Sequence, residues 1–293
     1  MLEVSAVNRS FGSKRVLRDV TFTVGDGRMT GFVGANGAGK TTTMRIILGV
    51  LSADSGRVTV DGAELHASDR RRFGYMPEER GLYPKMKVAE QIVYLARLHG
   101  LTPAAAQKNT AQLLERLGLE ERANTAVESL SLGNQQRAQI AAALVHDPEI
   151  LVLDEPFSGL DPIAVETVQG VLKERAAEGV PVLFSSHQLD IVERLCDDLV
   201  IIADGSIRAS GSRERLRSEF GGAQYEVEVG ESAEWVRGRA GVDVVSIDGG
   251  RAVFRATPDA AQSVLHAALE RGPVVRFTPH EPSLTQIFRE VIQ

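Results

Sequence analysis

The sequence is poor in cysteine and in long apolar runs. Its 293 residues contain one cysteine, Cys196, so an internal disulfide is excluded and a reducing cytosol fits. We expect this thiol to be buried rather than nucleophilic. No apolar run approaches the roughly 20 residues that a membrane-crossing helix needs, and no basic region followed by an apolar core indicates a secretory signal. Any membrane role is therefore expected to come through a partner.

An excess of positive charge is also missing. The 33 Lys and Arg residues are outnumbered by 39 Asp and Glu residues, which gives a net charge of -6. This balance argues against nucleic-acid binding by the whole chain, although it leaves a local basic patch possible. The hydrophobic fraction of 43% and charged fraction of 25% are ordinary for a globular protein. The length allows one large domain, or a large domain and a small one.

Short apolar runs alternate with segments of helical period through much of the chain. This alternation predicts an α/β domain with a largely parallel central sheet. The expected strands are 29–33, 149–153, 180–185 and 199–203, and the expected helices are 41–50 and 163–178. The opening segment differs, because 2–7 and 16–24 indicate two antiparallel strands joined by a turn at Gly12-Ser13.

Between about residues 86 and 148 the pattern is helical. Segments 88–99, 103–117 and 134–144 carry helical spacing, with Gly100 and Gly118 placed as stops. We therefore expect a helical subdomain inside a first domain of residues 1–217.

A small C-terminal domain is expected at residues 222–293, after a hinge at Gly221-Gly222. Its pattern predicts strands at 225–229, 242–247, 252–256 and 274–278, and helices at 231–239, 258–271 and 283–292. Asp248-Gly249-Gly250 is a typical hairpin turn. The order βαββαβ with a terminal helix indicates an α+β domain similar to a ferredoxin-like fold. Trp235, Phe254 and Phe288 are expected in its core rather than in a binding site.

A glycine-rich segment satisfies the P-loop pattern. It reads Gly34-Ala35-Asn36-Gly37-Ala38-Gly39-Lys40-Thr41 and lies between an expected strand and an expected helix. Glycines let consecutive backbone N–H groups curl around phosphate oxygens, and a helix N-terminus favours an anion. We expect Asn36, Gly37, Ala38, Gly39, Lys40, Thr41 and Thr42 to bind nucleotide phosphates, with Lys40 on the terminal phosphates and Thr41 on Mg²⁺. The alternative is a glycine-rich turn without a ligand.

Two adjacent acids, Asp154 and Glu155, end the apolar run 150–153. A strand buried on both faces delivers its last residues to the carboxyl edge of the sheet, where ligands of open α/β sheets bind. We expect Asp154 to hold Mg²⁺ and Glu155 to accept a proton from an attacking water. The alternative is a solvated strand end.

Three further segments carry a resemblance to a known family. Leu130-Ser131-Leu132-Gly133-Asn134-Gln135-Gln136-Arg137 resembles the signature motif of the ABC ATPases, as a variant of Leu-Ser-Gly-Gly-Gln. Ser158-Gly159-Leu160-Asp161 is similar to their D-loop, and His187 follows a strand as their switch histidine does. Phe11 stands where the family places an adenine-stacking aromatic. The resemblance covers residues 1 to about 215 and implies an ABC-type P-loop NTPase fold.

The resemblance implies an ATPase that uses ATP and Mg²⁺ and works as a dimer. Two subunits, equal or merely related, would pack head to tail, so that Ser131, Gly133 and Asn134 of one reach the γ-phosphate held by the P-loop of the other. Glu155, His187 and Lys40 would be catalytic, and Asp161 would link the two sites. The plainer interpretations are a buried structural histidine for His187 and a core residue for Phe11.

Two departures from the family pattern stand out. After Tyr75-Met76-Pro77 the family's Q-loop has glutamine, whereas this chain has Glu78, so its expected contact with metal or nucleotide acquires a negative charge. Leu132 and Asn134 differ inside the signature, but Ser131 and Gly133 remain.

In these departures and in its C-terminal domain, the chain resembles the sodium- and drug-efflux branch of bacterial ABC transporters. The segment 77–84 and the terminal segment 281–288 carry this part of the resemblance. It implies an exporter subunit that sits at the cytoplasmic face of the membrane through a separate permease, with 85–94 at the docking surface. The alternative is a soluble ABC ATPase that acts on ribosomes or DNA. A regulatory subunit without hydrolysis is contradicted by the presence of Glu155 and His187. The sequence does not indicate the transported substrate.

Overall fold

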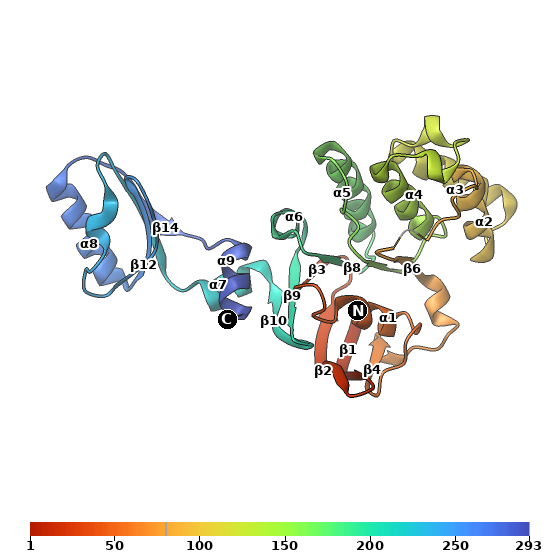
Figure 1. Cartoon of the computed structure of the whole chain (residues 1–293), viewed down its shortest axis with the longest axis horizontal. Coiled ribbons are helices and arrows are strands. Elements are labelled where there is room, and N and C mark those ends of the chain that lie inside the picture. Colours follow the sequence, from red (N-terminus) through yellow and green to blue (C-terminus); the bar gives the residue numbers. More distant parts are fainter. Residues whose placement is uncertain (80, 293) are drawn as a thin grey trace. The chain divides into compact units, whose positions relative to one another are not determined.

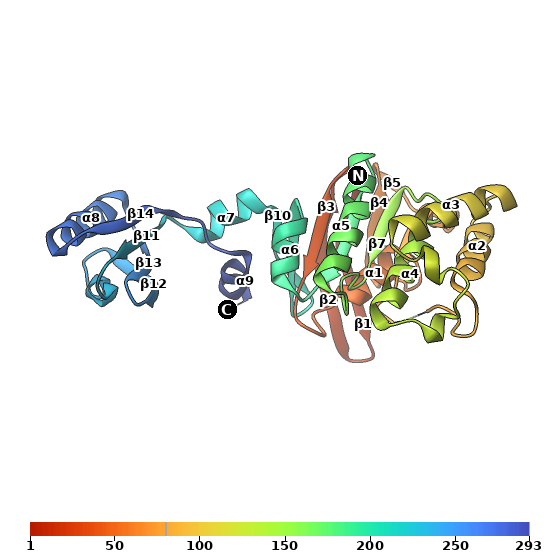
Figure 2. The ribbon, with the colours of Figure 1, turned by 90° about the horizontal axis from the view of Figure 1, so that it is seen from above.

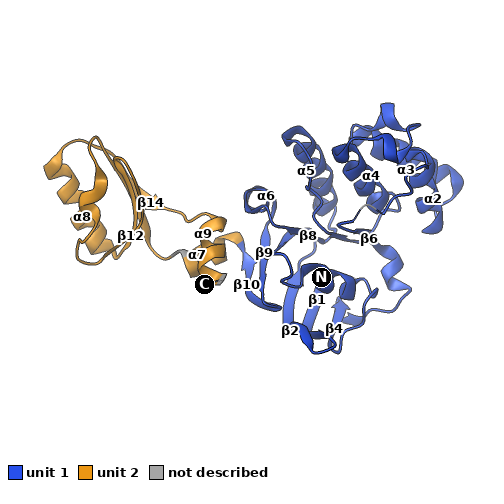
Figure 3. Cartoon of the chain, viewed as in Figure 1, with its two compact units in different colours: residues 1–212 blue, residues 213–293 orange. Residues whose placement is uncertain are grey.

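The computed structural model describes residues 1–79 and 81–292, so Arg80 of the expected segment 77–84 lies outside the described residues. The chain divides into two compact units, residues 1–212 and 213–293 (Figure 3). The expected first domain ran to residue 217, but helix α7 (Arg213–Gly221) belongs to the second unit, where it packs against α9 (Leu284–Ile292).

The first unit contains a four-stranded antiparallel sheet. Its strand order is β2-β1-β4-β5. The strands are β1 (Leu2–Phe11), β2 (Lys14–Val24), β4 (Ser55–Val60) and β5 (Ala63–Glu64). The expected antiparallel pairing of the first two strands is confirmed, with Leu2 opposite Val24 and Phe11 opposite Lys14. Buried and exposed residues alternate along the second half of β2, as they do in a strand with one face on a core.

A six-stranded sheet forms the centre of the first unit, in the order β10-β9-β3-β8-β7-β6. Its strands are β3 (Met29–Val33), β6 (Phe73–Met76), β7 (Ile150–Leu153), β8 (Val182–Ser186), β9 (Asp198–Ala203) and β10 (Ser206–Ser212). All neighbours pair in parallel except β9 and β10. Strands β3, β7 and β8 are buried along their whole length, which explains their continuous apolar runs.

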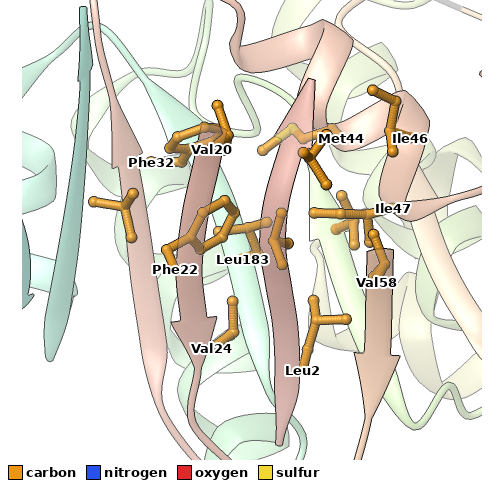
Figure 4. Packing of buried hydrophobic residues seen from close by; sticks show 14 of the residues in the cluster. Leu2, Val20, Phe22, Val24, Phe32, Met44, Ile46, Ile47, Val58 and Leu183 are labelled. Atoms are coloured by element: carbon orange, nitrogen blue, oxygen red, sulfur yellow. The ribbon is translucent and has the colours of Figure 1, made fainter. Parts of the chain in front are cut away.

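The core of the first unit lies between its two sheets. Helix α1 (Lys40–Ile47) contributes Met44 and Ile47, which pack with Phe22 of β2 and with Phe32 and Leu183 of the central sheet (Figure 4). This packing fixes the helix that begins at Lys40 against the strand that ends at Val33. The loop between them is therefore held at both ends.

Helices cover the other parts of the first unit (Figures 1 and 2). The predicted helical subdomain consists of α2 (Val88–Leu98), α3 (Pro103–Arg116) and α4 (Leu132–Leu144), with 3₁₀ turns at Glu120–Arg122 and Val127–Ser129. Helix α5 (Pro162–Ala177), α6 (Leu189–Leu195) and a 3₁₀ turn at Asp69–Arg72 complete the unit. Helix α3 begins with the cap Thr102 before Pro103, and α5 with the cap Asp161 before Pro162, both favoured start signals.

The second unit has the predicted strand order. Strands β11 (Gln224–Val229), β12 (Val242–Asp248), β13 (Arg251–Ala256) and β14 (Val274–His280) form an antiparallel sheet in the order β12-β13-β11-β14. Helix α8 (Pro258–Arg271) contributes Val264 and Ala268 to a core with Val227 and Phe254. This is the ferredoxin-like strand order that the sequence predicts.

Two predictions for the second unit need correction. The expected helix 231–239 is only a 3₁₀ turn, Ala233–Val236, because Arg237 is extended and Gly238 takes a positive φ of 76°. Phe254 is in the core and Trp235 packs at its edge, but Phe288 lies on α9 and is not part of that cluster. Within the described residues, none of the helices has the length and apolar character needed to span a membrane.

Candidate functional site

Four loops meet at the carboxyl edge of the central sheet. They follow β3, β8, β7 and β6, which are neighbours in this order. The loops carry, respectively, the glycine-rich segment, His187, the acidic pair, and Glu78. Because parallel strands end at the same edge, segments far apart in the sequence share one site.

The glycine-rich loop is shaped by backbone conformations that suit glycine. Gly39 has φ 112°, and a Cβ at this position would lie 2.6 Å from Leu17 Cδ2. Lys40 is buried, and its ammonium group donates to the carbonyl of Gly34 at 2.7 Å and of Ala35 at 3.3 Å. The lysine is thus folded over its own loop, with a ready donor for phosphate oxygens.

A cleft of about 660 Å³ opens beside this loop. Six expected phosphate-binding residues line it: Asn36, Gly37, Gly39, Lys40, Thr41 and Thr42. Ala38 is buried beneath them. Glu78, Asp154 and Glu155 line the same cleft.

Asp154 is fixed by two hydroxyl groups. Thr41 Oγ1 donates to Asp154 Oδ2 at 2.8 Å, and Ser185 Oγ donates to Asp154 Oδ1 at 2.5 Å. The backbone N–H of Asp154 donates to the carbonyl of Met76 at 2.8 Å. Asp154 and Ser185 are fully buried, so the bond between them is made away from water. Together with the part-buried bond from Thr41, it holds the carboxylate in one orientation. The negative charge of Asp154 adds to burial in raising the pKa of the Tyr75 hydroxyl.

The hydroxyl of Thr41 and the carboxylate of Asp154 fit a magnesium ion. Mg²⁺ takes hard oxygen ligands, keeps several waters, and is usually held by one or two carboxylates together with substrate phosphates. Glu78 lines the same cleft and could supply a further carboxylate. The donor set therefore suits Mg²⁺ brought in with a nucleotide.

Glu155 is held in an unusual backbone conformation. Its φ is 53°, a region that residues other than glycine rarely adopt. Its N–H donates to Ser185 Oγ at 2.8 Å, and its carbonyl accepts from Gln136 Nε2 at 2.9 Å. Its side-chain Oε2 lies 2.9 Å from His187 Nδ1. The carboxylate is thus placed at the cleft with an imidazole beside it.

The signature-like segment lies elsewhere on the first unit. Ser131 caps α4 by accepting from the N–H of Asn134 at 3.4 Å, and Leu132 is 56% exposed. Neither these residues nor Gly133 line the cleft. Asp161 caps α5 by accepting from the N–H of Ala164 at 2.9 Å and is also outside the cleft lining. One chain therefore does not bring all the expected nucleotide contacts together.

Phe11 also lies outside the lining of the cleft. It ends β1, is 48% exposed, and its ring lies under the guanidinium of Arg9, with the guanidinium carbon 4.9 Å from the ring centroid. This placement is not the core position that the plainer interpretation expected. Stacking of adenine on Phe11 stays a prediction.

The structure adds residues that the sequence reasoning did not select. Lys14, Arg15 and Arg18 of β2 line the cleft, as do Asp204 and Gly205 of the β9–β10 turn. Ser185 could have been noticed as a polar residue at the end of an apolar strand. No sequence signal pointed to these three basic residues, because their position at the cleft depends on how the antiparallel sheet packs.

Comparisons with known proteins match both units. Residues 17–158 match a family described as ABC transporter. Residues 211–292 match a family described as ATP-binding protein DrrA1-3-like, C-terminal domain. The second match covers the sheet and helices of the second unit.

Whole-chain relatives and solved structures agree with these matches. The chain is 38% identical over 293 residues to the ABC transporter ATP-binding protein YhaQ of Bacillus subtilis (strain 168), covering 100% of this chain and 98% of the relative. It is 36% identical over 225 residues to the linearmycin resistance ATP-binding protein LnrL of the same organism, covering 76% and 72%. A solved structure of an ATP-binding subunit of an ABC transporter matches with a TM-score of 0.70 and 34% identity, covering 75% of this chain and 93% of that one.

Proposed function

This chain belongs to the ATP-binding subunits of ABC transporters, and we propose that it hydrolyses ATP in a dimer that drives a separate membrane permease. The observation that carries the proposal is the meeting of Thr41, Asp154 and Glu155 in one cleft, with His187 hydrogen-bonded to Glu155. Together with the hydrogen-bond donors of the phosphate loop, they supply what ATP hydrolysis needs at one place: groups that bind phosphate, metal ligands and a proton acceptor.

In the proposed reaction, the glycine-rich loop and Lys40 bind the phosphates, and Mg²⁺ would supply positive charge beside the terminal phosphates. Thr41 and Asp154 would hold that ion. A water attacks the γ-phosphorus, and the carboxylate of Glu155 accepts its proton as the bond to the β-phosphate oxygen breaks. His187, whose Nδ1 is bonded to Glu155, would hold the γ-phosphate and the attacking water in position. The products are ADP and inorganic phosphate.

The separation of the two half-sites supports the proposed dimer. Ser131, Gly133 and Asn134 lie outside the cleft lining of their own chain, while the start of α4 is accessible, with Leu132 56% exposed. A head-to-tail partner would place this helix N-terminus on the γ-phosphate, where its N–H groups favour an anion. Asp161 would then face the partner. The two chains can be identical or related.

The exporter assignment rests on the relatives. LnrL is described as a linearmycin resistance ATP-binding protein, and the second unit matches a DrrA1-3-like C-terminal domain. By analogy, this chain would act at the cytoplasmic face of the membrane, attached through a polytopic permease, with 85–94 in the contact.

The experiment that tests the ATPase is the substitution Glu155→Gln, which keeps the size of the side chain but removes the proton acceptor. We expect the ATP hydrolysis rate to fall by at least about a thousandfold and an ATP-dependent dimer to accumulate on gel filtration. Glu166→Gln is the matched control, because Glu166 lies on the surface of α5 away from the cleft. A hydrolysis rate that stays at the wild-type level in Glu155→Gln would remove Glu155 as the base.

The transport part of the proposal is tested by affinity purification of the full chain from detergent-solubilised cells. We expect a polytopic membrane protein to co-purify, and its identity would also indicate the class of substrate. Sedimentation with ribosomes that survives high salt, without any membrane protein, would instead support the alternative of a soluble ABC ATPase.

A further inference from the structure

Gln136 is a buried side chain that contacts the backbone of the proposed catalytic carboxylate. It lies on α4 and is 4% exposed. Its Nε2 donates to the carbonyl of Glu155 at 2.9 Å. A buried amide is costly unless it is hydrogen-bonded, so this contact determines where the side chain lies. The same carbonyl accepts from the N–H of Ser158 at 3.2 Å, at the entry to the D-loop.

The contact matters because Glu155 is in a disfavoured conformation. A φ of 53° at a residue with a side chain persists only where the surroundings enforce it. Two side chains do so here, Ser185 on the N–H and Gln136 on the carbonyl. Ser185 belongs to the neighbouring strand β8, whereas Gln136 comes from the helical subdomain.

The position of Gln136 connects two functional regions of one chain. Helix α4 begins at the cap Ser131, and Gln136 follows five residues later, roughly 7.5 Å along the helix axis. A Cβ added at Gly133 would lie 3.4 Å from the carbonyl oxygen of Gly159, so the first turn of α4 also packs on the D-loop. A movement at the start of this helix is therefore transmitted to the turn that carries Glu155.

We propose that Gln136 is a positioning residue that aligns Glu155 for hydrolysis and links the signature-bearing helix to the carboxylate of the same chain. When the partner's ATP contacts Ser131, the shift of α4 reaches Glu155 through this hydrogen bond. Binding of ATP at one site of the dimer thereby prepares hydrolysis at the other. The inference rests on the proposed function of Glu155.

The test compares Gln136→Met and Gln136→Glu with Thr110→Val in the full chain. Both changes at Gln136 remove the N–H donor, one with an apolar side chain and one with a polar side chain of the same size. Thr110 is 2% exposed on α3, and within residues 1–79 and 81–292 its hydroxyl has no hydrogen-bond partner. The control therefore replaces a buried polar side chain of the helical subdomain with an apolar one without affecting Glu155.

We expect kcat of the Gln136 variants to fall by between tenfold and about a hundredfold, the loss that misplacement of a reacting group by up to an ångström produces. Affinity for a non-hydrolysable ATP analogue, measured by calorimetric titration, should change less than about threefold, because the phosphate loop is untouched. Thr110→Val should keep both values. A kcat within twofold of wild type, a parallel loss of analogue affinity, or failure of both Gln136 variants to fold would overturn the proposal.

A double variant separates positioning of Glu155 from closure of the dimer. Glu155→Gln combined with Gln136→Met should form the ATP-dependent dimer as fully as Glu155→Gln alone. Loss of the dimer only in the double variant would show that Gln136 acts on closure and would overturn the proposal. A wild-type chain without ATPase activity would refute the proposed function itself, which is a different outcome.

Discussion

Ser185 offers the most direct test of how the acidic pair is held. The substitution Ser185→Ala removes one buried oxygen that makes two bonds: it donates to Asp154 at 2.5 Å and accepts from the N–H of Glu155 at 2.8 Å. The side chain is fully buried, so water cannot easily replace it. The N–H of Glu155 would be left without its acceptor, and Asp154 would keep only the hydroxyl of Thr41 on its side chain.

The expected destabilisation can be worked out from these two losses. A buried donor left unpaired costs about 1–3 kcal/mol, and a hydrogen bond to a charged group contributes about 1.5–3 kcal/mol. Because one oxygen serves both, the two costs overlap, and we expect a loss of about 3 kcal/mol in the free energy of unfolding. For a unit of this size about 1 kcal/mol shifts Tm by roughly 2–4 °C, so Tm should fall by about 6–12 °C.

The assay is differential scanning calorimetry of the nucleotide-free chain, with Ser186→Ala as the matched control. Ser186 is also buried, but its Oγ accepts from the N–H of Gln188 at 3.0 Å and makes no other bond within the described residues; Gln188 is exposed. We expect the control to cost no more than about 1 kcal/mol. Equal Tm shifts for the two variants, or a Tm for Ser185→Ala within about 2 °C of wild type, would refute this account of the acidic pair.

Two further predictions concern the phosphate loop and the contact between helical subdomain and sheet. Gly39→Ala should weaken ATP binding at least about tenfold in calorimetric titration, because the added Cβ would clash with Leu17 and the backbone at Gly39 is left-handed. Gly179 also has a left-handed backbone but lies in open space, so Gly179→Ala should leave the affinity for ATP unchanged. Equal affinities would contradict this. Burial, and then the stacked ring of His99, lower the pKa of His146 from 6.5 to about 4. His146 is thus neutral when folded, so protonation favours unfolding and stability falls as the pH drops from 6.5 toward 4. The Tm of His146→Gln should therefore fall less between pH 7 and pH 5 than the Tm of the wild type. Parallel plots of Tm against pH for the two proteins would contradict this prediction.

Much of the first unit could be predicted because its signals are local. The run 29–33, the glycines that follow and Lys40 determine a strand, a loop and a helix within a few residues. The acidic pair after 150–153 is equally local, and both predictions led to the carboxyl edge of a parallel sheet. The four strands of the second unit and its helices 258–271 and 283–292 were predicted for the same reason, whereas Gly238 limits 231–239 to one short turn.

Strand β6 and helix α7 show where local signals are too weak. The four residues of β6 follow an arginine-rich turn, and their strand conformation is stabilised by pairing with β7. Helix α7 ends at Gly221, the first residue of the glycine pair expected to act as a hinge, and it is stabilised by packing against α9. In both cases the partner lies far away in the sequence.

By itself, the sequence determined that this protein has a phosphate-binding loop, an acidic pair and a signature-like helix start. The tertiary structure alone decided which side chains hold these groups. Because β8 pairs with β7 on one side and β3 on the other, Ser185 reaches both Asp154 and Glu155. Because α4 packs near the turn after β7, Gln136 bonds to the carbonyl of Glu155. The physical reason is that motifs depend on neighbouring residues along the chain, whereas hydrogen-bond partners across a sheet depend on strand order.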